Sequence, residues 1–129
     1  MSKATGFTEA EIRKHGEKGC ESGVQLQMTI CTLYKHYEKD VALNVTYQRL
    51  IRKLEKQTSR EELRAAQRAW VTFRDAQCRF ETAAWEGGSA RAMINAACLS
   101  VMTVERTKQL QETLECEGED CPEFKKEER

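Results

Sequence analysis

Proline and long apolar segments are nearly absent from this sequence of 129 residues. It contains one proline, and no apolar run approaches the roughly 18–20 residues that a helix needs to cross a bilayer. The formal net charge is zero, because 21 basic side chains balance 21 acidic ones. We therefore expect no membrane insertion, and no overall positive charge that would attract nucleic acid.

The chain is short and only 40% apolar, while 33% of its residues are charged. This length allows one domain with a thin core and a large solvated surface. Its helix-breaking residues lie near the two ends, except for Gly87 and Gly88. The segments 24–86 and 89–117 thus form helix without the roughly 1 and 3 kcal/mol that an interior glycine and proline cost.

Apolar residues recur at steps of three and four, the period of an amphipathic helix, and do not alternate as they do in strands. We predict an all-α protein: three long antiparallel helices, at about 24–56, 60–85 and 90–115, form a helical bundle stapled by disulfides. The predicted core faces contain Leu33, Tyr37, Val41, Tyr47, Leu50, Ile51 and Leu54; Leu63, Ala66, Trp70, Phe73, Gln77, Phe80 and Ala84; and Met93, Ala97, Val101, Val104, Leu110 and Leu114. Most core volume is expected from Tyr37, Tyr47, Trp70, Phe73, Phe80 and Trp85.

Two serines stand where the second and third helices are predicted to begin. Ser59 is followed three residues later by Glu62, the pattern of a capping box. Gly87 and Gly88 permit a tight reversal, after which Ser89 is expected to cap the third helix.

Six cysteines are an even number and a high density for a reducing compartment, so they predict up to three disulfides. Cys78 and Cys98 lie ten residues before and after Gly88. Antiparallel helices place two such residues at the same height, within bridging distance if both face inward. We therefore predict a Cys78–Cys98 disulfide.

The other four cysteines predict two further pairs. Cys116 and Cys121 flank a short turn, which favours a local Cys116–Cys121 disulfide. A Cys20–Cys31 disulfide then follows by elimination. Eleven residues of one helix span about 16 Å, beyond disulfide reach, so this pair requires the chain to fold back at Gly23.

Motifs for catalysis or cofactor binding are not found. The cysteines lack the paired CxxC spacing of zinc sites, and the two histidines, His15 and His36, are not near a nucleophile in a recognisable motif. No GxSxG and no glycine-rich phosphate loop occurs. We expect no enzyme activity, no catalytic residues, no cofactor and no metal, and we place His36 on the surface.

The oxidising compartment that the cysteines predict is reached by secretion. The first seven residues lack the apolar core of a signal peptide. Either the leader has been removed and a methionine added, or the disulfide interpretation is wrong. We favour the first and expect a periplasmic or secreted protein.

Two polar residues are expected to form contacts within the bundle. Asn44 falls on the apolar stripe of the first helix, so we expect a buried amide, with Gln67 as a candidate partner. Arg74 has carboxylates near it in the sequence, and we expect it to form an ion pair with a residue beside Asp75 or with Glu81. An exposed pair of that kind contributes only about 0–1 kcal/mol.

The balanced total charge conceals a segregation of charge along the chain. Basic residues gather at the end of the first helix, where the helix dipole favours cations: Arg49, Arg52, Lys53, Lys56 and Arg60. Acidic residues gather near the C-terminus: Glu112, Glu115, Glu117, Glu119, Asp120 and Glu123. Two interpretations of the acidic group stay open, a surface that attracts a basic partner such as lysozyme or a solvated chain end.

Several segments, taken together, resemble the LprI-type lysozyme-inhibitor family. Residues 66–78, AQRAWVTFRDAQC, are similar to its signature AQRAWxxFRDxxC. Residues 40–47 are similar to DxxLNxxY, 87–89 to GGS and 98–110 to CLxxxTxxRxxxL, while 28–31 resemble the family's segment around the first-helix cysteine. The likeness spans about 20–121. We accordingly divide the chain into an N-terminal extension at 1–19, which holds a short helix near 8–18 or none, a helical domain at 20–121 and a charged, frayed tail at 122–129.

This resemblance implies a small secreted bacterial protein that binds and inhibits a lysozyme-like peptidoglycan hydrolase. The alternative is an envelope structural or adaptor module that binds a partner protein without inhibiting any enzyme, and a third interpretation is an undetected hydrolase. We expect a monomer or weak dimer. The motif implies structural roles for Asp40, Asn44, Tyr47, Gln67, Trp70, Phe73, Arg74, Asp75 and Arg106. Among these, we hypothesise that Asp40, Asp75 and Arg106 form an ionic cluster that clamps the three helices.

Overall fold

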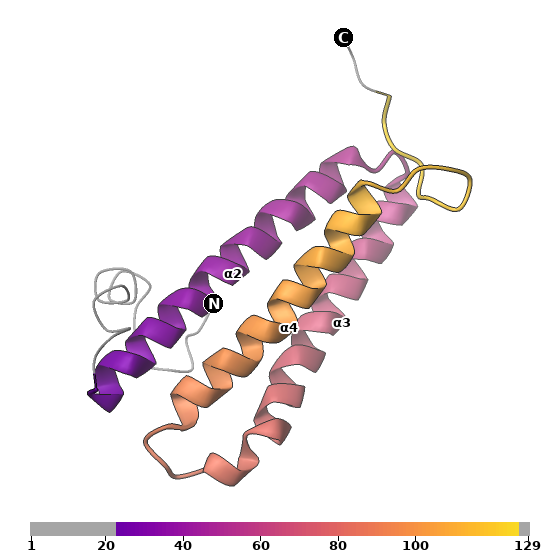
Figure 1. Ribbon diagram of the computed structural model, residues 1–129. Helices are drawn as coiled ribbons and strands as arrows, with labels where there is room; N and C mark the ends of the chain where they lie inside the picture. The colour runs from indigo at the N-terminus through magenta and orange to yellow at the C-terminus, as the bar shows by residue number, and fades with distance from the viewer. Residues whose placement is uncertain (1–22, 127–129) are drawn as a thin grey trace.

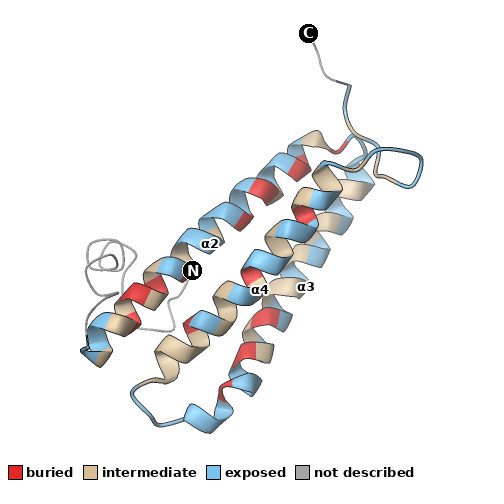
Figure 2. Cartoon of the chain, in the orientation of Figure 1, coloured by how far each residue is buried: buried red, intermediate tan, exposed pale blue. Residues whose placement is uncertain are grey.

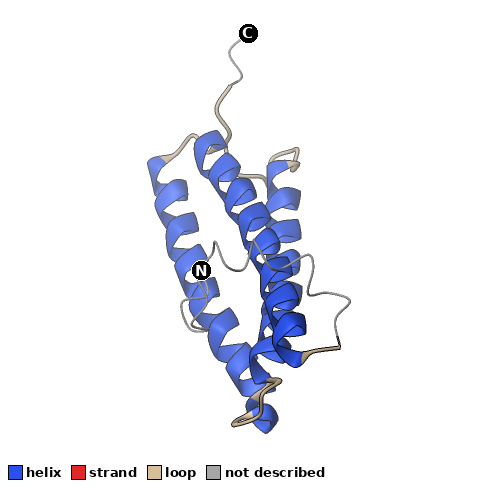
Figure 3. Ribbon diagram, turned by 90° about the vertical axis from the view of Figure 1, so that its left-hand side faces the viewer, coloured by secondary structure: helices blue, strands red, loops and turns tan. Residues whose placement is uncertain are grey.

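Three long helices make up the computed structural model, which describes residues 23–126 (Figure 1). Helix α2 spans Gln25–Lys53, α3 spans Gln57–Glu81 and α4 spans Arg91–Leu114, with a short 3₁₀ helix η2, Ala83–Trp85, before α4. Within the described residues no strand occurs (Figure 3). None of these helices has the length and apolarity needed to cross a membrane.

The chain reverses direction between consecutive helices, as predicted, so α3 runs antiparallel to both α2 and α4. The C-terminal ends of α2 and α4 consequently lie at the same end of the bundle (Figure 1). Helix α2 packs chiefly against α4. The predicted all-α bundle of three antiparallel helices is confirmed.

The connection between α2 and α3 does not use the predicted capping box. Helix α3 begins earlier than expected, so Ser59 and Glu62 lie inside it, and no side chain caps its first turn. Arg60 instead donates hydrogen bonds from Nη1 to the carbonyls of Leu54, at 2.6 Å, and Glu55, at 3.0 Å. Because the last carbonyls of a helix lack partners within it, this guanidinium satisfies the end of α2.

The reversal before α4 lies at the predicted glycines. Gly87 has a φ of +80°, a left-handed conformation that glycine adopts without steric cost. The predicted cap at Ser89 is wrong, because α4 begins at Arg91 and no side chain bonds to its first turn.

The core consists of two apolar clusters that α2 and α4 share. The larger contains Leu43, Leu50, Leu54 and Leu110, with Tyr47, Leu63, Trp70, Leu114 and Phe124 packed against it, and the smaller contains Leu33 and Ala96, with Tyr34 and Tyr37. Buried positions recur every seven residues, at Thr29, His36, Leu43 and Leu50 in α2 and at Ala96, Thr103 and Leu110 in α4 (Figure 2). Such a spacing keeps one face of each helix against its neighbour along their length.

Three aromatic residues predicted to fill the core lie on the surface. Phe73 is 56% exposed, Phe80 is 75% exposed and Trp85 is 48% exposed. Phe73 and Phe80 belong to the apolar side of α3, but that side faces away from α2 and α4. The prediction was wrong because apolar spacing identifies a face without identifying what covers it.

The predicted core face of α4 is confirmed at Leu110 and Leu114, which lie in or against the larger core cluster, and is wrong at two of its valines. Val101 and Val104 are exposed, whereas Ala96 and Thr103 are buried. The face that packs against α2 contains small and polar residues, so the larger valines on the other side dominate the apolar pattern. Further residues of the predicted faces that are exposed are Val41, Ala66, Ala84 and Ala97.

Two disulfides stabilise the described part of the chain, both at predicted pairs. Cys78–Cys98 joins α3 to α4 and Cys116–Cys121 closes a loop after α4, each with a Cα–Cα distance of 5.8 Å. Cys31 is buried, and no described cysteine is free. Cys20 lies outside the described residues, as does the extension 1–19, so the Cys20–Cys31 pair stays a prediction.

The described part of the predicted frayed tail, residues 122–126, is held against the bundle, contrary to the prediction, while 127–129 lie outside the described residues. A β-bridge pairs Leu54 with Phe124, and the backbone N–H groups of Glu55 and Lys125 donate hydrogen bonds of 3.0 and 2.8 Å across it. Phe124 also packs on the larger core cluster. This anchoring fixes the position of the loop that precedes Phe124.

Candidate functional site

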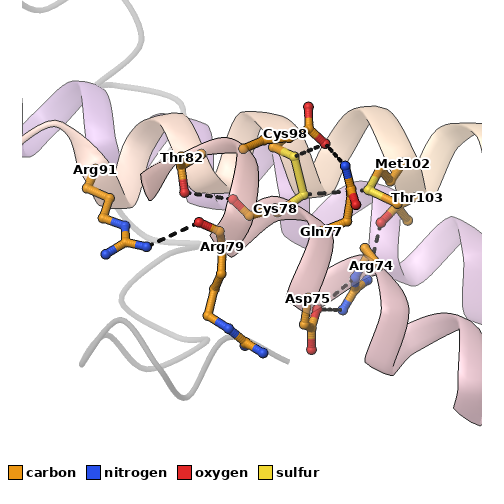
Figure 4. The surroundings of a disulfide bond; sticks show 11 residues. Arg74, Asp75, Gln77, Cys78, Arg79, Thr82, Arg91, Cys98, Met102 and Thr103 are labelled. Atoms are coloured by element: carbon orange, nitrogen blue, oxygen red, sulfur yellow. Dashed lines mark hydrogen bonds and ion pairs between the residues drawn. A yellow bond between two sulfur atoms is a disulfide. The ribbon is translucent and has the colours of Figure 1, made fainter. Parts of the chain in front are cut away.

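A buried arginine connects all three helices between the two apolar clusters. Arg74 on α3 is 8% exposed. Its Nη1 donates hydrogen bonds to Asp40 Oδ1 on α2, at 3.1 Å, and to Thr103 Oγ1 on α4, at 3.2 Å. Its Nε donates to Asp75 Oδ1 at 3.0 Å (Figure 4). Each of the three helices therefore supplies a carboxylate or hydroxyl oxygen that accepts a hydrogen bond from the buried guanidinium, and a buried charge requires such partners.

This arrangement corrects the predicted ionic cluster. Asp40 and Asp75 do take part, but the cation between them is Arg74 and not Arg106. The expected pairing of Arg74 with Glu81 is absent from the ion pairs of residues 23–126.

Arg106 belongs to a neighbouring set of contacts around Trp70. It donates from Nε to Gln67 Oε1 at 3.0 Å, and its guanidinium lies 5.8 Å from the Trp70 ring centre. Arg74 lies 5.2 Å from the same ring, so the indole contacts two cations. Burial lowers the pKa of Arg106. Asn44 is exposed and Gln67 bonds to Arg106, so the predicted buried Asn44–Gln67 pair is wrong.

His36, which we expected on the surface, lies beside Asp40 among these polar contacts. We call His36, Asp40, Arg74, Asp75 and Thr103 the polar layer. His36 is 3% exposed, its Nε2 lies 3.9 Å from Asp40 Oδ2, and its Nδ1 has no hydrogen-bond partner. Loss of hydration by burial lowers the pKa of His36, while the nearby Asp40 carboxylate acts in the opposite direction. The imidazole is therefore held in its neutral form at neutral pH.

The Cys78–Cys98 disulfide lies beside this polar layer on α3 and α4 (Figure 4). Cys78 is completely buried, and its sulfur lies 3.6 Å from the sulfur of Met102. Thr82 Oγ1 donates to the Cys78 carbonyl at 2.7 Å and so closes the end of α3. The disulfide and the Met102 contact hold α3 against α4, together with the hydrogen bonds of Arg74 to Thr103 and of Arg106 to Gln67.

Several residues of the family-like motif gather in one groove between α2 and α3. This groove has a volume of about 460 Å³. Its lining contains Asp40, Asn44, Tyr47, Gln67 and Arg74. Arg74 spans the groove and donates a hydrogen bond to Asp40, which joins α3 to α2. Five of the nine motif residues line this groove, and Trp70, Asp75 and Arg106 contact two of the five, Arg74 and Gln67. Phe73 alone lies apart, on the outer face of α3.

Five of the six acidic C-terminal residues form two groups, and the sixth, Glu123, pairs with Lys56. Glu112 and Glu115 line a groove of about 530 Å³ between α2 and α4, together with Lys39 and Lys108. Two lysines there offset the two carboxylates. The other three, Glu117, Glu119 and Asp120, are exposed on the loop closed by the Cys116–Cys121 disulfide. We call residues 116–121 the acidic loop.

The basic end of α2 lies beside the acidic loop because α2 and α4 end at the same side of the bundle. Lys53 donates to the Leu114 carbonyl at 3.0 Å and lies 4.4 Å from the Phe124 ring centre. Lys56 pairs with Glu123 at 3.6 Å. These cations stabilise the end of α4 and the chain beyond it. None of the ion pairs in the described part of the chain involves the carboxylates of the acidic loop.

Gly118 lies at the turn of the acidic loop, with a φ of +112°. A left-handed conformation of this kind favours glycine over residues with a Cβ. The Cys121 N–H donates to the Gly118 carbonyl at 3.3 Å within the loop. In Figure 1 the loop projects from the end of the bundle, beyond the last turn of α4.

Two residues of the polar layer, His36 and Thr103, were not found as functional residues from the sequence. Each is polar, so a search for apolar spacing passes over it. The sequence feature that could have identified them as buried is a seven-residue interval. His36 lies seven residues from both Thr29 and Leu43, and Thr103 lies seven residues from both Ala96 and Leu110.

Comparison with known proteins agrees with the motif. The family described as "Lysozyme inhibitor LprI" matches residues 18–110. A protein of Rhizobium meliloti (strain 1021), named "Uncharacterized protein R02472", is 30% identical over 112 residues, which cover 77% of this chain and 81% of the relative. No solved structure matches the chain significantly. The matched residues include α2, α3 and most of α4, and the chain belongs to the lysozyme inhibitor LprI family.

Proposed function

We propose that this protein acts in the periplasm or outside the cell, where it binds and inhibits a lysozyme-like peptidoglycan hydrolase through the acidic loop. The family description supports the hydrolase as the partner. Two disulfides in the described residues support an oxidising compartment, where such bonds persist. The protein acts by binding, with no catalytic step of its own.

One observation carries the choice of surface: Glu117, Glu119 and Asp120 are exposed, and none of the ion pairs within residues 23–126 involves them, on a loop held at both ends. The Cys116–Cys121 disulfide closes the loop, and the Leu54–Phe124 bridge anchors the chain beyond it. A loop fixed before binding loses little conformational freedom on association, which favours affinity. Its negative charge attracts a strongly basic enzyme and accelerates their encounter.

The test is a muramidase assay with a basic lysozyme, at low and high salt. We expect inhibition that weakens with salt, because screening removes the attraction between exposed charges. The loop variant Glu117→Lys/Glu119→Lys/Asp120→Lys should lose inhibition. A matched control, Glu38→Lys/Glu86→Lys/Glu105→Lys, changes the net charge by the same amount at exposed sites outside the loop and should keep inhibition.

The outcome also separates the alternatives. Loss of inhibition in the control variant to the same extent as in the loop variant would contradict the assignment of the loop. A periplasmic pull-down that recovers a partner, without inhibition of any hydrolase, would favour the envelope adaptor. Hydrolysis of peptidoglycan by the protein itself would contradict both.

A further inference from the structure

Lys53, the last residue of α2, contacts the chain on both sides of the acidic loop. Its Nζ donates a hydrogen bond of 3.0 Å to the carbonyl of Leu114, two residues before the loop begins. The same Nζ lies 4.4 Å from the ring centre of Phe124, three residues after the loop ends. The side chain of one residue thus connects α2 to both segments that flank the loop.

The contact with Leu114 satisfies the end of α4. Leu114 is the last residue of this helix, and the final carbonyls of a helix have no donor within it. An ammonium group supplies the missing donor, and its positive charge suits the negative end of the helix dipole. Because the hydrogen bond is partly buried, water competes with it less than at an open surface. The end of α4 is therefore fixed beside the end of α2.

The contact with Phe124 holds the segment that leaves the loop. The Phe124 ring packs on the larger core cluster, and the backbone of this residue pairs with Leu54. An ammonium group beside an aromatic ring is attracted to the negative charge on the ring face. The backbone carbonyl of Lys53 also accepts a hydrogen bond of 2.8 Å from the N–H of Lys125. Lys53 therefore lies between two anchored segments, the end of α4 and residues 124–125.

The Cys116–Cys121 disulfide does not by itself orient the acidic loop. It closes residues 116–121 into a ring and so limits their conformations. The backbone dihedrals outside the ring can still rotate, because a disulfide constrains only the residues that it encloses. Contacts on both sides of the ring oppose such a rotation, and Lys53 makes one on each side. The closed loop thus depends on its flanking contacts to keep one orientation.

Lys53 holds the loop without neutralising its charge. Its Nζ contacts a carbonyl and an aromatic ring, and it takes part in none of the ion pairs formed within residues 23–126. The neighbouring cation Lys56 pairs with Glu123 outside the loop, but both side chains are more than half exposed, so water weakens that contact. Lys53 is therefore the better-placed residue for fixing the loop while its three carboxylates keep their negative charge.

We propose that Lys53 is a positioning residue that fixes the orientation of the acidic loop before a hydrolase binds. The inference rests on the proposed function, and it requires no contact between Lys53 and the partner. A loop that already has its bound orientation loses less conformational freedom on association, so the complex dissociates more slowly. The rate of association depends instead on the charges of the loop. Loss of the Lys53 ammonium group should therefore affect dissociation rather than association.

The first experiment measures the loop in the free protein. Backbone NMR order parameters of residues 117–120 should be about 0.85 in wild type and fall below about 0.6 in Lys53→Met, which removes the ammonium group. Lys53→Arg keeps a cation and a donor and should keep the loop ordered. The matched control, Arg52→Met, removes the same charge from an exposed neighbouring position and should also keep it ordered. Circular dichroism verifies that the variants keep their helices.

The second experiment measures the rate constants of binding to a basic lysozyme. Lys53→Met should raise the dissociation rate constant at least about threefold and leave the association rate constant within about twofold of wild type. Lys53→Arg and Arg52→Met should match wild type in both constants. The loop variant Glu117→Lys/Glu119→Lys/Asp120→Lys should instead lower the association rate constant. A purely structural role of Lys53 would lower the free energy of unfolding without changing the dissociation rate of the folded protein.

The two experiments separate this inference from the proposed function. Equal order parameters in wild type and Lys53→Met overturn the role of Lys53, and so does a loop that loses its order without faster dissociation. A wild-type protein that binds no lysozyme contradicts the proposed function, and the order parameters then still decide whether Lys53 orients the loop. If Lys53→Met does not fold, Phe124→Leu takes its place, because it removes the ring beside Nζ and keeps an apolar side chain.

Discussion

Arg74 and Asp40 form an ion pair of 3.1 Å between α3 and α2, with side chains that are only 9% and 16% exposed. Such a pair has lost most of its hydration and depends on its remaining partners. Thr103 from α4 accepts a further hydrogen bond from the same nitrogen of Arg74. One polar contact therefore determines how the three helices are placed relative to one another.

Replacement of Arg74 should strongly destabilise the bundle. In Arg74→Met the Asp40 carboxylate stays buried without its cation, and removal of one partner of a buried pair costs about 3–5 kcal/mol. Urea unfolding with the disulfides intact measures the change. Arg49→Met, at an exposed site on α2, should stay within about 0.5 kcal/mol of wild type. Equal stability of the two variants would contradict the structural role of Arg74.

The two carboxylates that bind Arg74 should differ in importance. Asp40 is 16% exposed and spans two helices, whereas Asp75 is 42% exposed and follows Arg74 on the same helix. We expect Asp40→Asn to cost about 1.5–3 kcal/mol, and Asp75→Asn less than about 1 kcal/mol because water screens the exposed pair. The same unfolding measurement compares them. The reverse order would show that the clamp depends on Asp75, and an unchanged free energy of unfolding in both variants would show that no clamp exists.

Stability should depend on pH through His36. Burial lowers the pKa of His36 in the folded protein below its usual 6.5, so the unfolded chain binds a proton that the folded protein excludes. The contribution of neutral His36 is thus fully present above about pH 6.5 and is lost as the pH falls from there towards the folded pKa. His36→Gln cannot titrate. As the pH falls from 7.5 to 5, the free energy of unfolding of wild type should therefore decrease relative to that of His36→Gln. A relative increase would indicate a raised pKa.

The sequence predicted those features that depend on local chemistry and on topology. Long segments without glycine or proline predicted the helices, and Gly87 and Gly88 marked the reversal. The Cys78–Cys98 pair could be predicted because equal distances from a reversal place two residues at one height in antiparallel helices.

Packing decided the features that the sequence did not predict. Thr103 is buried where it accepts a hydrogen bond from Arg74, which lies on another helix. His36 is buried beside Asp40, one turn further along the same helix. Apolar spacing contains no signal for such polar contacts. Phe73 has the spacing of a core residue yet is exposed. Apolar spacing identifies a face of a helix and contains no information on whether another helix covers that face.

The two disulfides should have separable effects on stability and on inhibition. Loop-closure entropy predicts that Cys78→Ala/Cys98→Ala loses about 3 kcal/mol and that Cys116→Ala/Cys121→Ala, whose loop is shorter, loses about 2 kcal/mol. Only the second pair holds the acidic loop in one conformation before binding, so only its removal should weaken inhibition of lysozyme under conditions where both variants are folded. Denaturation and the muramidase assay measure the two effects. Unchanged inhibition in Cys116→Ala/Cys121→Ala would show that the loop is not preorganised for binding. If Cys78→Ala/Cys98→Ala weakens inhibition equally, the contact with lysozyme depends on the whole bundle.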